Sequence, residues 1–227
     1  MKNFKAALFL MLLCPLGALN LSAQVSVGVR GGVNFSNINT EFEDPSNDFD
    51  ISNRAGYAVA VPIEIMITDF LAVQPELMYH QKGGKEELSF FGISATQEYI
   101  FNYVEVPVLL KVLAGGENIG VGLLAGPAFS YARSGEYIIS VLGTVESVDL
   151  FDTEDDEIFF DRKEFNLHLG AAPYINVAGL KIFADGRYIL GLNDISDEES
   201  NSAVAPEEYG TVKNRTVQVT AGVIFNF

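Results

Sequence analysis

The sequence has a single thiol, Cys14, and no tryptophan, and its basic residues are few. One cysteine excludes an intrachain disulfide framework. Fourteen Lys and Arg residues stand against 30 Asp and Glu residues, for a net charge of -16. So acidic a chain lacks the basic surface that a phosphate backbone requires, which argues against nucleic acid as a partner.

Long apolar runs are also missing beyond residue 23, where none approaches the roughly 18 residues that mark a membrane-spanning helix. The N-terminal apolar stretch Ala6–Leu19 follows Lys2 and Lys5 and ends in small residues, which is the order of a secretory signal peptide. It is too short to span a bilayer as a helix. We therefore expect residues 1–23 to be a cleaved signal peptide and residues 24–227 to form one domain.

What the sequence has in abundance is strict alternation of apolar residues with small or polar ones. This period of two sends neighbouring side chains to opposite faces of a β-strand. Most of the alternating segments are longer than the ~5 to 6 residues of soluble sheets and match the ~9 to 11 residues of a tilted strand that crosses a bilayer. The predicted strands lie near residues 25–35, 57–67, 71–79, 104–112, 121–131, 165–177, 182–190 and 217–227.

The connections between these segments alternate between short and long. Short ones are expected at residues 68–70, 113–118 and 177–179, and long ones at 36–53, 81–95, 134–162 and 193–213. The long connections hold most of the acidic residues, as in barrels that have short periplasmic turns and long external loops. Because lipid offers no partner to backbone groups, a spanning sheet must close. The sequence thus predicts an all-β fold, an eight-stranded antiparallel up-and-down transmembrane β-barrel.

Alternation alone does not reveal which face of the sheet points inward. In a soluble periplasmic carrier of lipocalin type, the apolar face would line a ligand cavity and the other face would meet water. Here the other face is rich in Gly, Ala, Ser and Asn, too sparse in charge for a solvent surface. We therefore expect the apolar face to contact lipid, with the soluble carrier as the alternative and a membrane-embedded lipid-modifying enzyme as a third, weaker one.

Charged residues recur at positions that alternation assigns to the inside of the barrel. The lumen of an eight-stranded barrel is narrow and filled by side chains, so these charges must pair with one another. We interpret them as a structural ion-paired network; a proton or ion path is the alternative. The predicted network consists of Arg30, Glu64, Glu76, Glu105, Lys111, Asp185 and Arg187.

Candidates for chemistry are few. A Ser/His/carboxylate hydrolase could be built around His168, which lies at an inward position, but no nucleophile motif or metal-ligand spacing accompanies it. The acidic run at residues 152–157 could bind a divalent cation, yet it lacks the spacing of a calcium loop and is typical of a solvated loop. We therefore expect no catalytic residues, no cofactor and no bound metal.

Prolines within the predicted strands do not fit the simple scheme, because each one removes a backbone donor from the sheet. We expect β-bulges at these positions, mainly near the short turns. The prolines concerned are Pro62, Pro75, Pro107, Pro127 and Pro173.

Six segments, taken in order, carry a family resemblance. They are GVRGGVNFSNI from Gly28, LAVQPELMYHQKGGK from Leu71, YVEVPVLLKV from Tyr103, GPAFSY from Gly126, FADGRYILGLNDIS from Phe183 and the C-terminal VTAGVIFNF. Together they resemble the small, PorT-like outer-membrane β-barrel proteins of Bacteroidetes-type bacteria.

The resemblance implies a place in the bacterial outer membrane but says little about activity. From the predicted barrel and its acidic loops we expect a structural or surface-interaction role. The resemblance also implies that Phe227 is the terminal signal read by the barrel-assembly machinery, which makes that machinery a partner. Outer-membrane lipid and lipopolysaccharide are the other expected partners, and the partner of the acidic loops is not indicated by the sequence.

Overall fold

The computed structural model describes residues 24–40, 52–90, 93–116, 118–151, 161–195 and 212–226. The expected signal peptide, the acidic run at 152–157 and Phe227 lie outside these residues. Within them there is no helix long and apolar enough to cross a membrane. The strands are β1 (Val25–Thr40), β2 (Ser52–Thr68), β3 (Leu71–Phe90), β4 (Ile93–Gly115), β5 (Ile119–Val141), β6 (Thr144–Asp149), β7 (Lys163–Val177), β8 (Leu180–Gly191) and β9 (Val212–Asn226).

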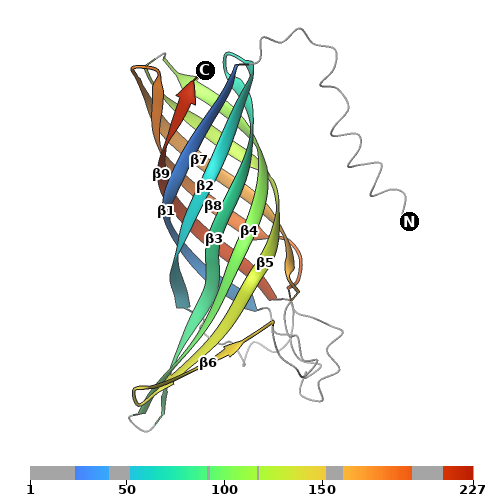
Figure 1. The fold of residues 1–227 in the computed structure, drawn as a ribbon, viewed down its shortest axis with the longest axis vertical. Coiled ribbons are helices and arrows are strands. Elements are labelled where there is room, and N and C mark those ends of the chain that lie inside the picture. The colour runs from blue at the N-terminus through green and yellow to red at the C-terminus, as the bar shows by residue number, and fades with distance from the viewer. Residues whose placement is uncertain are drawn as a thin grey trace, which may run out of the picture.

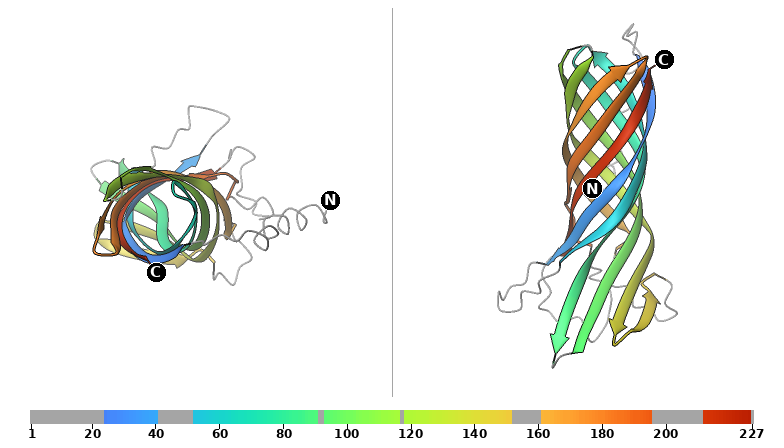
Figure 2. Two further views of the ribbon diagram at one scale, coloured as in Figure 1. Left: turned by 90° about the horizontal axis from the view of Figure 1, so that it is seen from above. Right: turned by 90° about the vertical axis from the view of Figure 1, so that its left-hand side faces the viewer.

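Eight of these strands close into a ring, which confirms the predicted antiparallel barrel. Each strand pairs with its neighbour in chain order from β1 to β5, then β5 pairs with β7, and β9 pairs with both β8 and β1 (Figure 1). Seen along its axis, the ring is closed (Figure 2). Three short connections, between β2 and β3, between β4 and β5, and between β7 and β8, lie where the short turns were predicted. We call the end of the barrel that carries them the short-turn end; β1 begins and β9 ends there (Figure 1).

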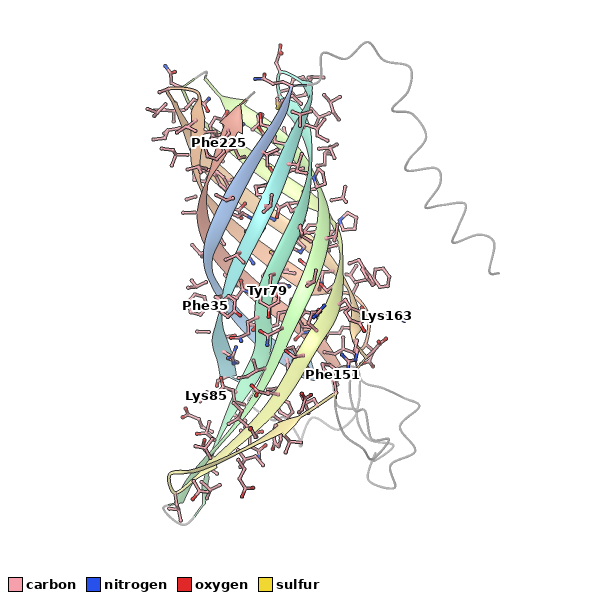
Figure 3. All side chains as sticks on the ribbon, in the orientation of Figure 1. Phe35, Tyr79, Lys85, Phe151, Lys163 and Phe225 are labelled. Carbon is pink, nitrogen blue, oxygen red and sulfur yellow. The ribbon has the colours of Figure 1, made fainter. Side chains whose placement is uncertain are left out.

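The apolar face of the strands points outward. Val59, Val106 and Val219, from three different strands, are 52%, 47% and 51% exposed, whereas the alternating polar residues are buried. The soluble carrier required these valines to face an internal cavity, so the structure contradicts that alternative. Side chains cover the whole outer wall, with Phe225 near the short-turn end and Phe35 and Tyr79 nearer the other end (Figure 3).

Two of the predicted long loops contain strand, which corrects the sequence prediction. β3, β4 and β5 are 20, 23 and 23 residues long, and they continue past the ends of the other strands (Figure 2). The predicted loop 81–95 is a hairpin of β3 and β4, and the loop 134–162 contains the end of β5 and all of β6. The prediction was wrong because these strand segments are mostly polar and lack the clear apolar alternation of the barrel wall.

We call this extension the projecting sheet; it comprises residues 85–90, 93–102 and 134–141, together with β6. β5 pairs with β7 only as far as Tyr131, opposite Lys163. Beyond that point the register of β4 and β5 shifts between Asn102 and Tyr103, so that one extra residue, Arg133, is accommodated in β5. A bulge of this kind bends the strand and increases its twist. The bulge thus lies where β5 leaves the ring.

The prediction of bulges at the prolines was wrong. The register is the same on both sides of each proline, and the recorded shifts lie elsewhere, at Asn53/Ala58, Met66/Thr68 and Asn102/Tyr103. Each proline pairs normally on one side, and the ladder on its other side skips two residue pairs. For Pro62, the β1–β2 ladder passes from the Val27/Ile63 pair to the Arg30/Ala60 pair. The missing N–H of a proline therefore leaves a short gap in one ladder. The strand pairs on both sides of the gap keep the same register.

Candidate functional site: the ion-paired lumen and the projecting sheet

The middle of the lumen holds two arginines and two carboxylates. Glu76 from β3 accepts a hydrogen bond from Arg30 Nη2 at 2.8 Å, and Arg187 binds both of its oxygens, at 2.9 and 2.8 Å. Arg187 also donates to Asp185, with its shortest contact at 2.7 Å. All four side chains are buried. The layer is electrically balanced, and the second nitrogen of Arg30 is satisfied by Gln218 and Thr220 at 2.6 and 2.9 Å.

Farther from the short turns, Glu105 is the centre of a second layer. Its carboxylate lies 2.8 Å from His168 Nε2 and 3.5 Å from His80 Nε2, and it accepts a hydrogen bond from Ser130 Oγ. Asn166 donates to the same carboxylate at 2.8 Å. Five groups from four strands thus meet in a fully buried cluster.

Lys82 links this second layer to another carboxylate. Its ammonium group lies 2.8 Å from Glu164 Oε2 and 3.7 Å from Glu105 Oε2, and all three side chains are buried. Apart from the two imidazoles, this layer thus has one ammonium group for two carboxylates.

Near the short turns, a third layer is built on Glu64. Lys111 Nζ lies 2.6 Å from Glu64 Oε2, and Lys181 Nζ contacts the other oxygen, Oε1. Lys111 also donates to Gln74 at 3.0 Å. This layer has two ammonium groups for one carboxylate, so its cations outnumber its anions.

All seven residues of the predicted lumen network are buried in one of these three layers. Arg30, Glu76, Asp185 and Arg187 form the middle layer, Glu64 and Lys111 lie near the short turns, and Glu105 lies in the layer beyond. The insertion signal expected at Phe227 lies outside the described residues. Phe225, two residues earlier, is exposed on the outer wall.

Several members of the network were missed from the sequence, chiefly Lys82, Glu164 and Lys181. Lys82 was assigned to a loop because the predicted strand ended near residue 79, although Met78 and His80 have the same parity. Glu164 was likewise counted among the loop acids, one residue before a predicted strand, although it matches the inward parity of Asn166 and His168. Continuing the alternation three residues past residue 79, and one residue before residue 165, would have placed both inside.

The residues of a possible hydrolase triad do lie close together, but in a different order. Ser130 and His168 both contact Glu105, so the carboxylate is in the middle of the three. In a serine hydrolase the histidine lies between the nucleophile and the acid. All three side chains have no solvent exposure. Among the described residues, no group of three or more His, Cys, Asp or Glu side chains could hold a metal ion.

An apolar cluster covers the lumen at the end away from the short turns. Phe101 and Tyr103 of β4 pack there, and Leu150 and Ile195 join them from segments outside the ring. The Phe101 and Phe151 ring centroids are 6.1 Å apart, and Arg162 lies over Phe151, 4.2 Å from the ring centroid. These side chains separate the ionic layers from the projecting sheet.

The projecting sheet exposes apolar side chains beyond the barrel. Leu142 at the β5–β6 turn is 78% exposed, and Val145 and Val148 of β6 are 64% and 50% exposed. β6 pairs with β5 alone among the described strands, so its other edge faces none of them. Lys85 lies on the same extension (Figure 3). Its hydrogen bond to Glu87, 2.7 Å long, lowers the pKa of the exposed Glu87 carboxyl.

Basic residues occur on the outward face just past the apolar wall. Arg133, Lys163 and Arg215 are exposed, and each lies two residues along its strand from an exposed apolar residue. Those apolar neighbours are Tyr131, Phe165 and Val217. These three strand cations therefore lie at the rim of the wall, whereas Lys85 lies farther out on the projecting sheet.

Several solved outer-membrane barrels are similar to this chain. The attachment invasion locus protein Ail of Yersinia pestis is 14% identical, with 90% of this chain and 100% of that chain covered and a TM-score of 0.37. Neisserial surface protein A is 12% identical, with 89% and 99% covered and a TM-score of 0.39. A major outer membrane protein of Thermus thermophilus is 13% identical, with 89% and 99% covered and a TM-score of 0.46. No curated protein matches the chain.

A family model also matches, that of the outer membrane protein beta-barrel domain, over residues 20–197. The match takes in β1 to β8, and β9 follows it and closes the ring. It agrees with the geometry: a closed antiparallel ring, an apolar outer wall and a polar lumen are the properties of a bacterial outer-membrane barrel. The chain belongs to the outer membrane protein beta-barrel domain family.

Proposed function

We propose that this outer-membrane barrel is a surface-interaction protein whose projecting sheet binds partners outside the cell. The observation that carries the proposal is the exposure of Leu142, Val145 and Val148 on a sheet that extends past the barrel wall. Exposed apolar side chains at a sheet edge that no described strand covers are typical of protein interaction sites. Within the family, we assign the chain to the PorT-like group on the six sequence segments that carry that resemblance.

The proposed orientation has the short turns in the periplasm and the projecting sheet outside the cell. This is the usual arrangement of bacterial barrels, and it places the long acidic connections on the external side. The rim cations Arg133, Lys163 and Arg215 would then lie at the level of the outer-leaflet head groups. We propose that they bind the phosphates of lipopolysaccharide, since exposed guanidinium and ammonium groups are good phosphate ligands. The barrel-assembly machinery is the proposed partner for insertion, through Phe227.

We propose no catalytic activity for this chain. The Ser130, Glu105 and His168 arrangement supports this, because the histidine is not placed to take a proton from the serine. The apolar cluster of Phe101, Tyr103, Leu150 and Ile195 also separates these groups from the outside. The three layers are proposed to serve as a structural plug, with each carboxylate held by two or more donors.

A trimmed barrel tests the interaction role. In one variant, residues 86–97 are replaced by a short Asn-Gly turn; Glu86 pairs with Gln97, so the cut keeps β3 and β4 in register. In a second, Leu142, Val145 and Val148 are changed together to Ser. We expect cells carrying either variant to lose attachment to other cells and to protein-coated surfaces, while the barrel keeps its heat-dependent gel mobility. Attachment equal to that of the unmodified chain would refute the role.

A further inference from the structure

The short-turn end of the lumen opens into a cavity of about 590 Å³. Its mouth is formed by the turn residues Asp69, Phe70 and Gly116, and its inner part is lined by Glu64, Tyr174 and Lys181. The cavity therefore reaches the Glu64 layer directly from outside the barrel. No function discussed above uses it.

The charged groups at the inner part of this cavity do not balance. Lys111 and Lys181 share the single carboxylate of Glu64, and the side chains of all three are at most 9% exposed. The nearest carboxylate on the same strand as Lys181 is Asp185, which is already held by Arg187 at 2.7 Å. Asp69 lies at the exposed mouth, where water screens its charge. Among the residues that the structure describes, one buried positive charge thus remains without a buried counter-charge, and a buried charge of this kind is costly.

Lys181 is the residue that presents this charge to the cavity. Its ammonium group has three donors, and within the described part of the chain one hydrogen bond is recorded for it, to Glu64. A second side of the group faces the ring of Tyr174, with Nζ 5.2 Å from the centroid. Lys181 lines the cavity and Lys111 does not. Lys111 is turned inward, toward Gln74 and the ring of Phe183.

Apolar residues close the cavity on its inner side. Leu109, Leu124, Phe183 and Ile224 form a buried cluster, and Tyr174 packs against it. An ion that enters from the short-turn end therefore meets the Glu64 layer and then this cluster, through which the buried Gln74 side chain links Lys111 to Glu76. This arrangement fits a blind binding cup better than a path through the barrel.

We propose that this cup is a binding site for a small oxyanion, a carboxylate or a phosphate, which enters from the periplasmic side and is held by Lys181. A bound anion would supply the missing negative charge, and a charge-assisted hydrogen bond in a site shielded from water is strong. The site is independent of the projecting sheet, so either proposal can fail without the other.

The test is a titration of the full barrel, refolded in detergent and labelled with ¹³C at lysine Cε. Inorganic phosphate and acetate are added in separate arms, each against sodium chloride at the same ionic strength. We expect saturable shifts of the Lys181 and Lys111 signals with a Kd on the order of 1 mM, and none for Lys85 on the projecting sheet. The arm that responds at lower concentration identifies phosphate or carboxylate as the preferred group.

Variants locate the site. Lys181→Met should weaken the response of Lys111 at least about tenfold, the value of one hydrogen bond to a charged group, whereas the control Lys85→Met on the projecting sheet should leave it unchanged. Gel mobility before and after heating reports whether each variant folds. If Lys181→Met does not fold, the titration of the unmodified chain still tests whether the cavity binds an anion. The absence of saturation with both anions, equal shifts at Lys85, or full binding by a folded Lys181→Met barrel would each overturn the proposal.

Discussion

Arg187 and Glu76 form a bidentate ion pair across the lumen, although 111 positions separate them in the sequence. The pair joins β8 to β3, which are not neighbours in the ring. Two parallel N–H···O bonds fix both distance and orientation, so a bidentate pair is more specific than a single contact. Arg30 from β1 binds the same carboxylate, and Glu76 therefore connects three strands.

Replacing Glu76 should destabilise the barrel more than any surface change. Glu76→Gln leaves Arg30 without its carboxylate partner and Arg187 with Asp185 alone, and an uncompensated buried charge costs about 3–5 kcal/mol. Urea unfolding in lipid vesicles, followed by the fraction of fast-migrating folded protein on gels, measures the loss. The control is Glu87→Gln on the projecting sheet, which should not change the unfolding midpoint. A loss below about 1 kcal/mol in Glu76→Gln would show that the two arginines do not depend on this carboxylate.

Two glycines of the barrel should respond differently to the same substitution. A Cβ at Gly126 would lie 2.1 Å from the carbonyl oxygen of Val108 and 2.8 Å from Leu109 Cα, whereas nothing lies within 4 Å of a Cβ at Gly186. Gly126→Ala should therefore cost about 1–3 kcal/mol, as overpacking does. Gly186→Ala should be neutral or slightly stabilising, because it restricts the unfolded chain. The same unfolding assay compares them, and equal midpoints for the two variants would be inconsistent with the close approach of β4 and β5.

The rim cations should determine how lipopolysaccharide affects stability. We expect lipopolysaccharide to raise the unfolding temperature of the purified barrel, and the combined variant Arg133→Gln, Lys163→Gln, Arg215→Gln to lose most of that rise. The matched control, Lys85→Gln on the projecting sheet, should keep it. Calorimetry in mixed micelles with and without lipopolysaccharide is the measurement. If the triple variant gains as much as the unmodified chain, the phosphates are bound elsewhere.

The parity of side chains could be predicted from the sequence, because it follows from the period of two alone. Val59, Val106 and Val219 were expected outside, and the structure has them there. Inward positions such as Arg30 and Asp185 were assigned by the same rule. Which inward residues pair with one another could not be predicted. The contact of Arg187 with Glu76 depends on the tilt and stagger of the strands, which are set when the ring closes.

The ends of β3 and β4 could not be predicted from the sequence. They lie in the projecting sheet, which carries the proposed interaction role. β3 and β4 continue to residues 90 and 93 through a mostly polar segment, in which backbone pairing between Lys85 and Glu98 holds the hairpin together. Nothing in the apolar pattern marks such a segment as strand, because neither of its faces has to meet lipid. At the prolines the sequence predicted an irregularity that the structure lacks. Because a proline has no backbone donor, we expected a bulge, but the rest of each ladder keeps its register.

The central claim, that the apolar wall of the barrel faces lipid while the projecting sheet lies in water, has a direct test in spin-label accessibility. Cys14 is the only cysteine and precedes residue 24, so single-cysteine variants of the chain from residue 24 onward are unambiguous. Labels attached to Val219→Cys and to Leu142→Cys, in barrels reconstituted in lipid, are compared for collision with dissolved oxygen and with a water-soluble nickel chelate. We predict that the label at 219 collides mainly with oxygen and the label at 142 mainly with the chelate. Strong collision of the chelate with the label at 219 would contradict the account.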